Sequence, residues 1–573
     1  MQKTLHHHLK PIGVVLLLYV MLHGSIGWLI PSFEPAIHND DWVYVYTIER
    51  LAAGESFRLH PMSAALALPQ LVAGWGLCTL TGSFSYSLLR GAMVVFGIVP
   101  VWYCWKIFRQ FGIDQRASLA ATVLFMANPL MVSMTWSYQT DVVYVACLLG
   151  AFSAVLASDQ MNETANPWRH HLFGALWLLT ACLTRQSGIF VAAAFGIWFL
   201  LRKDWKSTLL YWMLIPLTMF AERFFVKQSD LHFLPYTKGL VKESLMELSA
   251  SKLIYCLYEA CHIVGLLALF AAPIILLAGI PKKSKWLLSL GLALFAGMWL
   301  LDANSQRTIF LGNYLYFGTH SGVGPATLAI PPGGGSAPST VGMLTSLLTG
   351  LAIVAAVFWC WSTWGDYLLD LAAPLKRLTS PSGLLRWIWL IQLGSIVMVS
   401  ALIGRPPMDR YLLCLIPFSL LMVIPVNPSR VLIAGTWICG FGLAMFSLIG
   451  VVDYWRWNAV RWQAVAELEQ KGIEVWVIDG GYEYNGIHGM LAAPKETGLK
   501  FDVPGKPTDP DYWKRHDQYT LRFEPAADPS LNVAEYPYAS PFGIFQKTIY
   551  VTRTPAMNPA MERESRSVSQ TKN

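Results

Sequence analysis

Three acidic residues stand at the borders of long apolar runs, where they could carry out chemistry. Asp40 and Asp41 form an adjacent pair directly after the first apolar run, and Asp141 begins a later one. A carboxylate can take the proton of an attacking hydroxyl, so these acids are candidates for general base catalysis. Helix capping is the simpler alternative, because Asp is among the preferred N-cap residues.

Two arginines, Arg185 and Arg410, interrupt apolar segments further along the chain. A guanidinium is costly in lipid and offers a two-pronged fork that suits phosphate, so each is a candidate ligand-binding residue. The alternatives are a structural ion pair of Arg185 with Asp141 and, for Arg410, anchoring at a membrane interface. Three carboxylates around one pocket would repel one another unless a cation or a proton joined them. Arg185 is the obvious cation for that place.

The composition places these residues in a membrane protein. The chain has 573 residues, of which 54% are hydrophobic and 13% charged, and its mean hydropathy is +0.44. Its apolar runs approach the length of about 20 residues that crosses a bilayer. The nine cysteines include no CxxC pair, which argues against a disulfide framework or a zinc site. The net charge of +7 comes without a basic, aromatic-interleaved groove, so nucleic acid is not an expected partner.

Basic clusters alternate with the apolar runs, which under the positive-inside rule places the N-terminus in the cytoplasm and the C-terminus outside. We predict a polytopic α-helical protein with about 13 transmembrane helices. The predicted spans cover residues 11–30, 88–106, 117–135, 142–158, 172–185, 187–201, 207–224, 253–280, 286–302, 341–361, 384–403, 411–426 and 430–450.

Two segments do not fit simple crossings. The apolar run at residues 62–80 would place Arg109 and Arg116 outside if it crossed, so we predict a re-entrant or interfacial helix on the outer face. Residues 171–201 are too few to go out and return as two full spans. The turn that contains Arg185 would therefore lie below the outer surface and face a protein-lined cavity.

The residues after the acid pair predict an amphipathic helix. Trp42, Val45 and Tyr46 recur at helical spacing, and Gly54 ends the run. We expect this helix to lie along the outer interface with its aromatic side chains at the level of the lipid headgroups.

Residues 1–450 are predicted to form a transmembrane domain, with outer loops at residues 31–61, 222–252 and 302–340. The third loop contains a lid-like stretch rich in proline and glycine. After the last span, we predict a small extracytoplasmic α/β domain at residues 451–553 and a disordered tail at residues 554–573. Within the α/β domain we predict a helix at residues 461–472, a strand at 473–479, a turn at 482–486 and a closing strand at 548–553.

Four short patterns lie at the predicted outer ends of spans. They are Asp40-Asp41-x-x-Tyr44, Thr140-Asp141-Val142, Leu183-Thr184-Arg185-Gln186 and Asp409-Arg410-Tyr411-Leu412. In this order and on this side, the patterns resemble the GT-C glycosyltransferases, specifically the protein O-mannosyltransferase and aminoarabinose-transferase-like group of bacterial inner membranes. The resemblance implies a GT-C-like catalytic domain that moves a sugar from a polyprenyl-phosphate-linked donor to a hydroxyl of a glycan, lipid or protein. Transfer would occur on the outer face of the cytoplasmic membrane, with inversion at the anomeric carbon.

The resemblance implies that Asp40 is the general base, that Asp41 supports it, and that Asp141 is a third catalytic residue. The family pattern has an acid followed by glutamate where this chain has Asp-Asp, which leaves open which carboxylate faces the acceptor. An Asp at a helix N-terminus is stabilised as the anion and is a weak base. Asp40 would then orient the hydroxyl, or share a divalent metal ion with Asp141.

The resemblance also assigns the cations. Arg185 and Arg410 are implied contacts of the donor phosphate, where a cation would steady the departing group. Gln186 and Tyr411 are implied supports of these arginines, and Tyr44 completes the substrate-binding residues.

Two other classes of membrane protein stay open as alternatives. A secondary transporter also has many spans and buried charges, although its charges usually lie near the midplane between matching halves of the chain. A polysaccharide polymerase or ligase would share the lipid-linked substrate.

Overall fold

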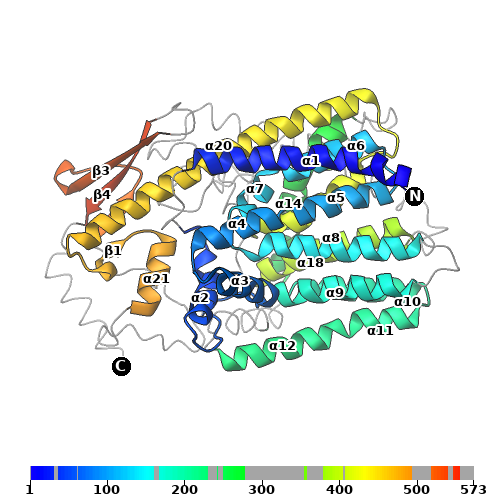
Figure 1. Cartoon of the computed structure of the whole chain (residues 1–573), viewed down its shortest axis with the longest axis horizontal. Coiled ribbons are helices and arrows are strands. Elements are labelled where there is room, and N and C mark those ends of the chain that lie inside the picture. Colours follow the sequence, from blue (N-terminus) through cyan, green and yellow to red (C-terminus); the bar gives the residue numbers. More distant parts are fainter. Residues whose placement is uncertain are drawn as a thin grey trace.

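The computed structural model describes residues 2–30, 37–60, 62–160, 167–229, 242, 249–277, 354–357, 378–403, 407–492, 518–539 and 546–554. These residues form a large bundle of helices and, toward the C-terminus, a small sheet (Figure 1).

Seven stretches among the described residues are long and apolar enough to cross a membrane. The helices α6 (Gln115–Met126) and α7 (Pro129–Thr135), which meet at 61°, would add an eighth as one broken span. This is the architecture of an integral membrane protein, as the composition predicted. The seven stretches lie in α1 (Gln2–Leu29), α4 with α5 (Tyr86–Phe96, Ile98–Gln110), α8 (Thr140–Asp159), α11 with α12 (Trp205–Trp212, Leu214–Gln228), α14 (Ala250–Leu277), α18 (Pro381–Ile403) and α20 (Arg430–Gln470).

Most of the predicted spans that fall on described residues are confirmed as helices of sufficient length. The predicted spans at residues 286–302 and 341–361 lie outside the described residues, apart from residues 354–357, so the total number of crossings stays a prediction. The confirmed spans are those predicted at residues 11–30, 88–106, 142–158, 207–224, 253–280, 384–403 and 430–450.

The single span predicted at residues 411–426 is wrong. The 3₁₀ helix η2 (Asp409–Cys414) and the eight-residue helix α19 (Ile416–Val423) take its place. An α-helix rises about 1.5 Å per residue, so α19 covers less than half of a hydrocarbon core of about 30 Å. The span predicted at residues 117–135 is likewise broken, because Pro129 starts α7 and cannot continue α6.

The short hairpin predicted at residues 171–201 is present. Its helices α9 (Trp168–Thr184) and α10 (Gly188–Leu201) have 17 and 14 residues, and the backbone of Arg185 between them is extended. The run at residues 62–80 contains α3 (Leu68–Thr81), which at 14 residues is also shorter than a crossing. The depth of either segment in a membrane stays a prediction.

α20 is one helix of 41 residues, whereas the sequence predicted a span to residue 450 and a separate helix from residue 461. Neither glycine nor proline stands at residues 451–460, so nothing in the sequence interrupts the helix. It ends before Gly472, which has a positive φ of 80°. α20 runs beside α1 and leads from the helix bundle to the sheet (Figure 1).

The C-terminal sheet has the strand order β1-β2-β4-β3. β1 and β2 are parallel, and β4 is antiparallel to both of its neighbours. β4 confirms the closing strand predicted at residues 548–553, whereas the strand predicted at 473–479 consists of a 3₁₀ turn, η3 (Val475–Val477), and the two residues of β1. The strands are β1 (Ile478–Asp479), β2 (Tyr519–Arg522), β3 (Asn532–Ala539) and β4 (Gln546–Arg553).

The turn predicted at residues 482–486 is wrong, because the helix α21 (Tyr482–Ala492) begins there. The side chain of Asn485 explains the difference. Its Oδ1 accepts from the Gly480 N–H at 3.1 Å, and its Nδ2 donates to Asp479 Oδ1 at 2.7 Å. Asn485, whose polar side chain suggested a turn, thus lies in α21 and forms hydrogen bonds with the loop that precedes this helix.

α2 (Asp41–Ala52) lies between two hydrophobic cores. Tyr44 and Val45 pack into the core of the helix bundle, while Trp42 and Val43 pack into a second core with α20, α21 and the sheet. The prediction that this helix lies along the lipid interface is therefore wrong. Its Trp42 is only 2% exposed, because protein covers it on both sides.

The remaining predictions concern loops and domain borders. The loop predicted at residues 222–252 is helical at both ends, in α12 and α14. The loop at residues 302–340 with its lid-like stretch, and the tail beyond residue 554, lie outside the described residues. The borders of the transmembrane and α/β domains stay predictions.

Candidate functional site

Neither acid of the pair caps α2 with its side chain. Asp40 occupies the N-cap position, but its carboxylate makes no capping hydrogen bond to the helix. Asp41 is the first helical residue, and its two oxygens turn to other elements. Helix capping therefore does not explain the positions of these two carboxylates.

Asp41 is completely buried and both of its oxygens are engaged. Oδ1 accepts from the backbone N–H of Tyr138 at 2.7 Å, and Oδ2 lies 3.3 Å from Nε of Arg90. The Arg90 guanidinium in turn stacks over the ring of Trp455 on α20, 4.5 Å from its centroid. Burial raises the pKa of Asp41 to about 7, although Arg90 and the Tyr138 N–H favour the carboxylate.

Asp40 points to a different arginine and stays partly accessible. Its Oδ2 lies 2.7 Å from Nη2 of Arg410 on η2, and its side chain is 19% exposed. Nη1 of the same guanidinium donates to Oε1 of Gln139, the residue before α8. The alternative that Arg410 only anchors a helix at the membrane interface does not fit these contacts, since the guanidinium points into the protein.

Asp141 in the first turn of α8 pairs with Arg185 at the junction of α9 and α10. The alternative of a structural ion pair is thus realised in this structure. The Arg185 guanidinium also lies over the ring of Tyr411 at 4.9 Å, and that of Arg410 lies over the same ring at 5.5 Å. Tyr411 is therefore close to both guanidinium groups.

Tyr44 lies near both the Asp40–Arg410 pair and the Asp141–Arg185 pair. The charges of Asp40, Arg410, Arg185 and Asp141 all act on its hydroxyl, and burial raises its pKa above the ordinary value. Each of the three predicted carboxylates thus has its own arginine, which removes the repulsion expected between them. Two of these pairs, those of Asp40 and Asp141, lie near Tyr44, and the arginines of both lie over the Tyr411 ring.

Gln186 follows Arg185 and was predicted to support phosphate binding. Its side-chain nitrogen is buried and has no hydrogen-bond partner among the residues that the structure describes. It precedes the N-terminus of α10, where backbone N–H groups add partial positive charge. A donor group in this place suits an anion.

The donor set around Asp40 and Asp141 does not fit the divalent metal that was considered for it. Both carboxylates are already engaged by guanidinium groups, which would repel a cation. Within the described ranges, no group of three or more His, Cys, Asp or Glu side chains is arranged to hold a metal ion.

Arg90 was missed by the sequence reasoning, although a signal for it was present. It lies inside the span predicted at residues 88–106, and a charge within a membrane span marks a functional site by default. Gln139 and the backbone N–H of Tyr138 had no such signal. Their roles depend on how the start of α8 meets α2 in space.

The comparisons with known proteins yield structural likeness alone. No family model matches the sequence, and neither does the sequence of any characterised protein. Among solved structures, the chain is similar to the archaeal oligosaccharyltransferase AglB from Archaeoglobus fulgidus in complex with an inhibitory peptide and a dolichol-phosphate, at 12% identity and a TM-score of 0.41 over 95% of this chain and 74% of that chain. It is also similar to ArnT from Cupriavidus metallidurans in the apo state, at 13% identity and a TM-score of 0.39 over 96% of this chain and 98% of that chain. Identities and TM-scores this low assign neither family nor activity, which depend on the chain's own residues.

Proposed function

We propose that the protein is an inverting glycosyltransferase that moves a sugar from a polyprenyl-phosphate-linked donor to a hydroxyl acceptor. The observation that carries the proposal is the paired arrangement of Asp40 with Arg410 and Asp141 with Arg185 around Tyr44 and Tyr411. It supplies a partly accessible carboxylate for the acceptor and two guanidinium groups for a phosphate in one site.

The two carboxylates of the pair have different surroundings, which supports a division of labour. Asp41 is buried with both oxygens occupied, so it holds the start of α2 in place through Tyr138 and Arg90. Asp40 is the acid that an acceptor can reach. In the proposed reaction, the acceptor hydroxyl donates its hydrogen bond to Asp40.

The transfer step balances with these residues alone. The acceptor oxygen forms a bond to the anomeric carbon from the face opposite the phosphate, and its proton passes to the Asp40 carboxylate. The bond between the anomeric carbon and the phosphate oxygen breaks, and the polyprenyl phosphate leaves with the electron pair. Arg185, the Gln186 side-chain nitrogen and the N-terminus of α10 stabilise the departing phosphate.

The proposed cellular location of the site rests on the membrane topology predicted from the sequence. The site would lie on the outer face of the bacterial cytoplasmic membrane, with the N-terminus inside and the C-terminal domain outside, as the distribution of basic residues predicts. Its partners would be the lipid-linked sugar, membrane lipids and a glycan, lipid or protein acceptor.

The experiment is transfer by the purified full chain reconstituted in lipid, with a panel of polyprenyl-phosphate sugars and isolated envelope glycoconjugates as acceptors, read by mass spectrometry. Asp40→Asn should lower transfer by at least about 100-fold, the lower end of what a general base contributes. Asp528→Asn, at an exposed position near β3, is the matched control and should leave transfer unchanged.

Two outcomes would contradict the proposal. Undiminished transfer by the Asp40→Asn variant would overturn the role of Asp40. Substrate-dependent flux across proteoliposomes without any glycosylated product would instead favour the transporter class.

A further inference from the structure

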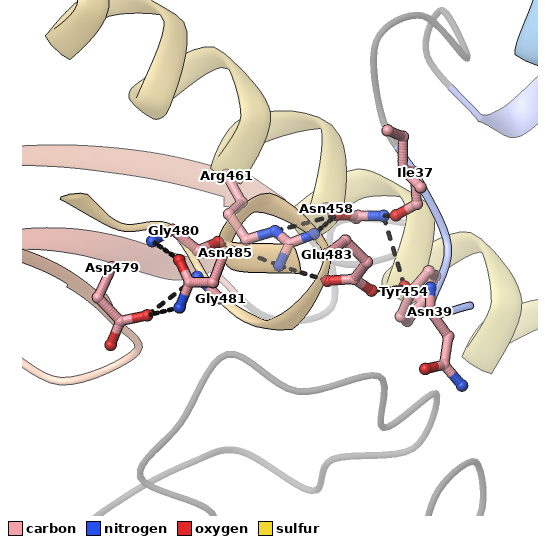
Figure 2. A network of polar contacts seen from close by, with 10 residues as sticks. All are labelled: Ile37, Asn39, Tyr454, Asn458, Arg461, Asp479, Gly480, Gly481, Glu483 and Asn485. Atoms are coloured by element: carbon pink, nitrogen blue, oxygen red, sulfur yellow. Dashed lines mark hydrogen bonds and ion pairs between the residues drawn. The ribbon is translucent and has the colours of Figure 1, made fainter. Parts of the chain in front are cut away.

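Glu483 of α21 reaches the loop that carries the acid pair. Its Oε1 accepts a hydrogen bond from the backbone N–H of Asn39 at 2.8 Å, and its Oε2 lies 2.8 Å from Nη1 of Arg461 on α20 (Figure 2). Both charged side chains are only 1% exposed. A residue 444 positions away in the sequence thus binds the backbone one residue before Asp40.

A second contact holds the other end of the same short segment. Nδ2 of Asn458 donates to the carbonyl oxygen of Ile37 at 2.7 Å, and Oδ1 of Asn458 accepts from Arg461 at 2.7 and 3.1 Å (Figure 2). Arg461 therefore joins both contacts, since it pairs with Glu483 and orients Asn458. Between these two contacts, His38 packs edge-on against Tyr454 with 4.5 Å between the ring centroids.

The held segment includes one residue in a left-handed backbone conformation. Asn39 has a positive φ of 46°, in the left-handed region that Asn adopts more readily than most residues with side chains. Such a conformation persists where surrounding contacts fix it, and it is concentrated at functional sites. The conformation of Asn39 sets the direction in which the chain enters Asp40 and hence where the Asp40 carboxylate points.

Further contacts tie α20, α21 and α2 together around this segment. Nη1 of Arg461 also donates to the carbonyl oxygen of Gly480 at 3.2 Å, which ties α20 to the loop before α21. α21 then packs directly on α2, because Gly486 faces the Trp42 ring with no room for a side chain. The side chains of Arg461, Glu483 and Trp42 in these contacts are all buried.

We propose that Glu483, Arg461 and Asn458 are positioning residues of the active site, through which the C-terminal domain sets the direction of Asp40 toward Arg410. This inference rests on the proposed transfer reaction, because it assigns these residues an effect on the Asp40 carboxylate. None of the three touches the reacting atoms. They act on the rate of the chemical step through the backbone of residues 37–39.

Glu483→Gln is a discriminating variant because it preserves size and leaves one oxygen for three donors, which are Arg461, the Asn39 N–H and the Tyr454 hydroxyl. The guanidinium of Arg461 is the strongest donor and would take that oxygen, which turns the new NH₂ group toward the Asn39 N–H. Asn458→Asp is an independent second variant. It keeps an acceptor for Arg461 and places a carboxylate oxygen against the Ile37 carbonyl in place of a donor.

The test measures two quantities on each full-length variant in lipid. Hydrogen–deuterium exchange of the peptide that covers residues 37–44 reports whether the segment is held, and steady-state transfer reports kcat and KM for the lipid-linked sugar. We expect faster exchange in this peptide and a fall in kcat of about 10- to 100-fold, as for a misplaced catalytic group, with KM for the donor within about twofold of the original. Glu535→Gln on the exposed face of β3 is the matched control and should change neither quantity.

The two readouts separate this inference from the proposed function. If the unaltered protein transfers no sugar, the proposed function fails. The exchange measurement tests the positioning contact independently of transfer, and unchanged exchange in both Glu483→Gln and Asn458→Asp would overturn that contact. If transfer occurs and both variants keep the original kcat, the positioning role is overturned even where exchange rises. A rise in KM with kcat unchanged would also overturn it, since that pattern is loss of donor binding.

Discussion

Asp41 and Arg90 form an ion pair in which neither side chain is more than 1% exposed, whereas the neighbouring pair of Asp40 and Arg410 is partly open to solvent. The two adjacent acids therefore differ in their arginine partner and in their exposure to solvent. The buried pair fixes the start of α2 against the beginning of α8 and against Trp455. In the second pair the Asp40 side chain is 19% exposed and the Arg410 side chain 10%.

Loss of the buried arginine should destabilise the protein strongly. Arg90→Met removes the cation beside Asp41, so the buried carboxyl must either take up a proton or remain without a charge partner. Breaking comparable buried pairs by removing one partner costs about 3–5 kcal/mol. The measurement is thermal or denaturant unfolding of the full chain in detergent. The double variant Arg90→Met with Asp41→Asn removes both charges and should recover much of the loss, because the Asn carbonyl can still accept from the Tyr138 N–H. Equal stability of Arg90→Met and the unaltered protein would show that the pair is not closed in solution.

The stability of the protein should depend on pH through Asp41. Burial raises the pKa of this carboxyl from 3.8 to about 7 in the folded protein. The folded state then binds the proton more tightly than the unfolded state, so the contribution is complete below about pH 4 and is lost as the pH rises through about 7. Asp41→Asn should remove this part of the pH dependence. The measurement is the unfolding midpoint of the unaltered protein and of Asp41→Asn from about pH 4 to 8. The same dependence of the midpoint on pH in both proteins would contradict the prediction.

Arg185 should act on donor binding more than on folding. Arg185→Lys keeps the positive charge but loses the two-pronged fork, so we expect KM for the lipid-linked sugar to rise about tenfold, the equivalent of one hydrogen bond. Arg202→Lys is the matched control, because Arg202 also pairs with an aspartate, Asp159, but does so at the far end of α10. Similar changes in KM for both variants would argue against a phosphate site at Arg185.

The contact between α21 and α2 can be tested with a single methyl group. A Cβ added at Gly486 would lie 2.4 Å from the Trp42 ring, closer than any real contact, so the two helices must separate. Gly486→Ala should destabilise the protein by about 1–3 kcal/mol, as overpacked cores do. Gly442→Ala in α20, where a Cβ meets no atom within 4 Å, should instead be neutral or slightly stabilising. Equal unfolding midpoints for the two variants would contradict the close packing.

The residues and pairings of the candidate site could be predicted from the sequence only in part. Charged residues are rare in apolar segments, so Asp40, Asp141, Arg185 and Arg410 stand out by type and position alone. Their partners do not, because a pairing such as that of Asp40 with Arg410 joins segments far apart in the chain. The alternative of an ion pair between Arg185 and Asp141 was the one pairing foreseen, and the structure contains it.

Errors in the predicted elements have the same origin. The span at residues 411–426 is apolar enough to cross, but Pro417 and the contacts of η2 with the site divide it. The helix after the acid pair has an amphipathic sequence, yet a second core formed with α20 and α21 covers the face that was expected to meet lipid. Local patterns describe how apolar a segment is, and they do not say whether lipid or protein covers it.

The sequence by itself determined the class of the protein, the position of most long helices and most charged residues of the candidate site, but not Arg90. These follow from hydrophobicity and helical length, which are local properties of the chain. Only the tertiary structure decided which arginine meets which acid, why Asp41 is buried while Asp40 is open, and how Glu483 reaches Asn39. Those relationships depend on distances between segments hundreds of residues apart, and no local pattern contains them.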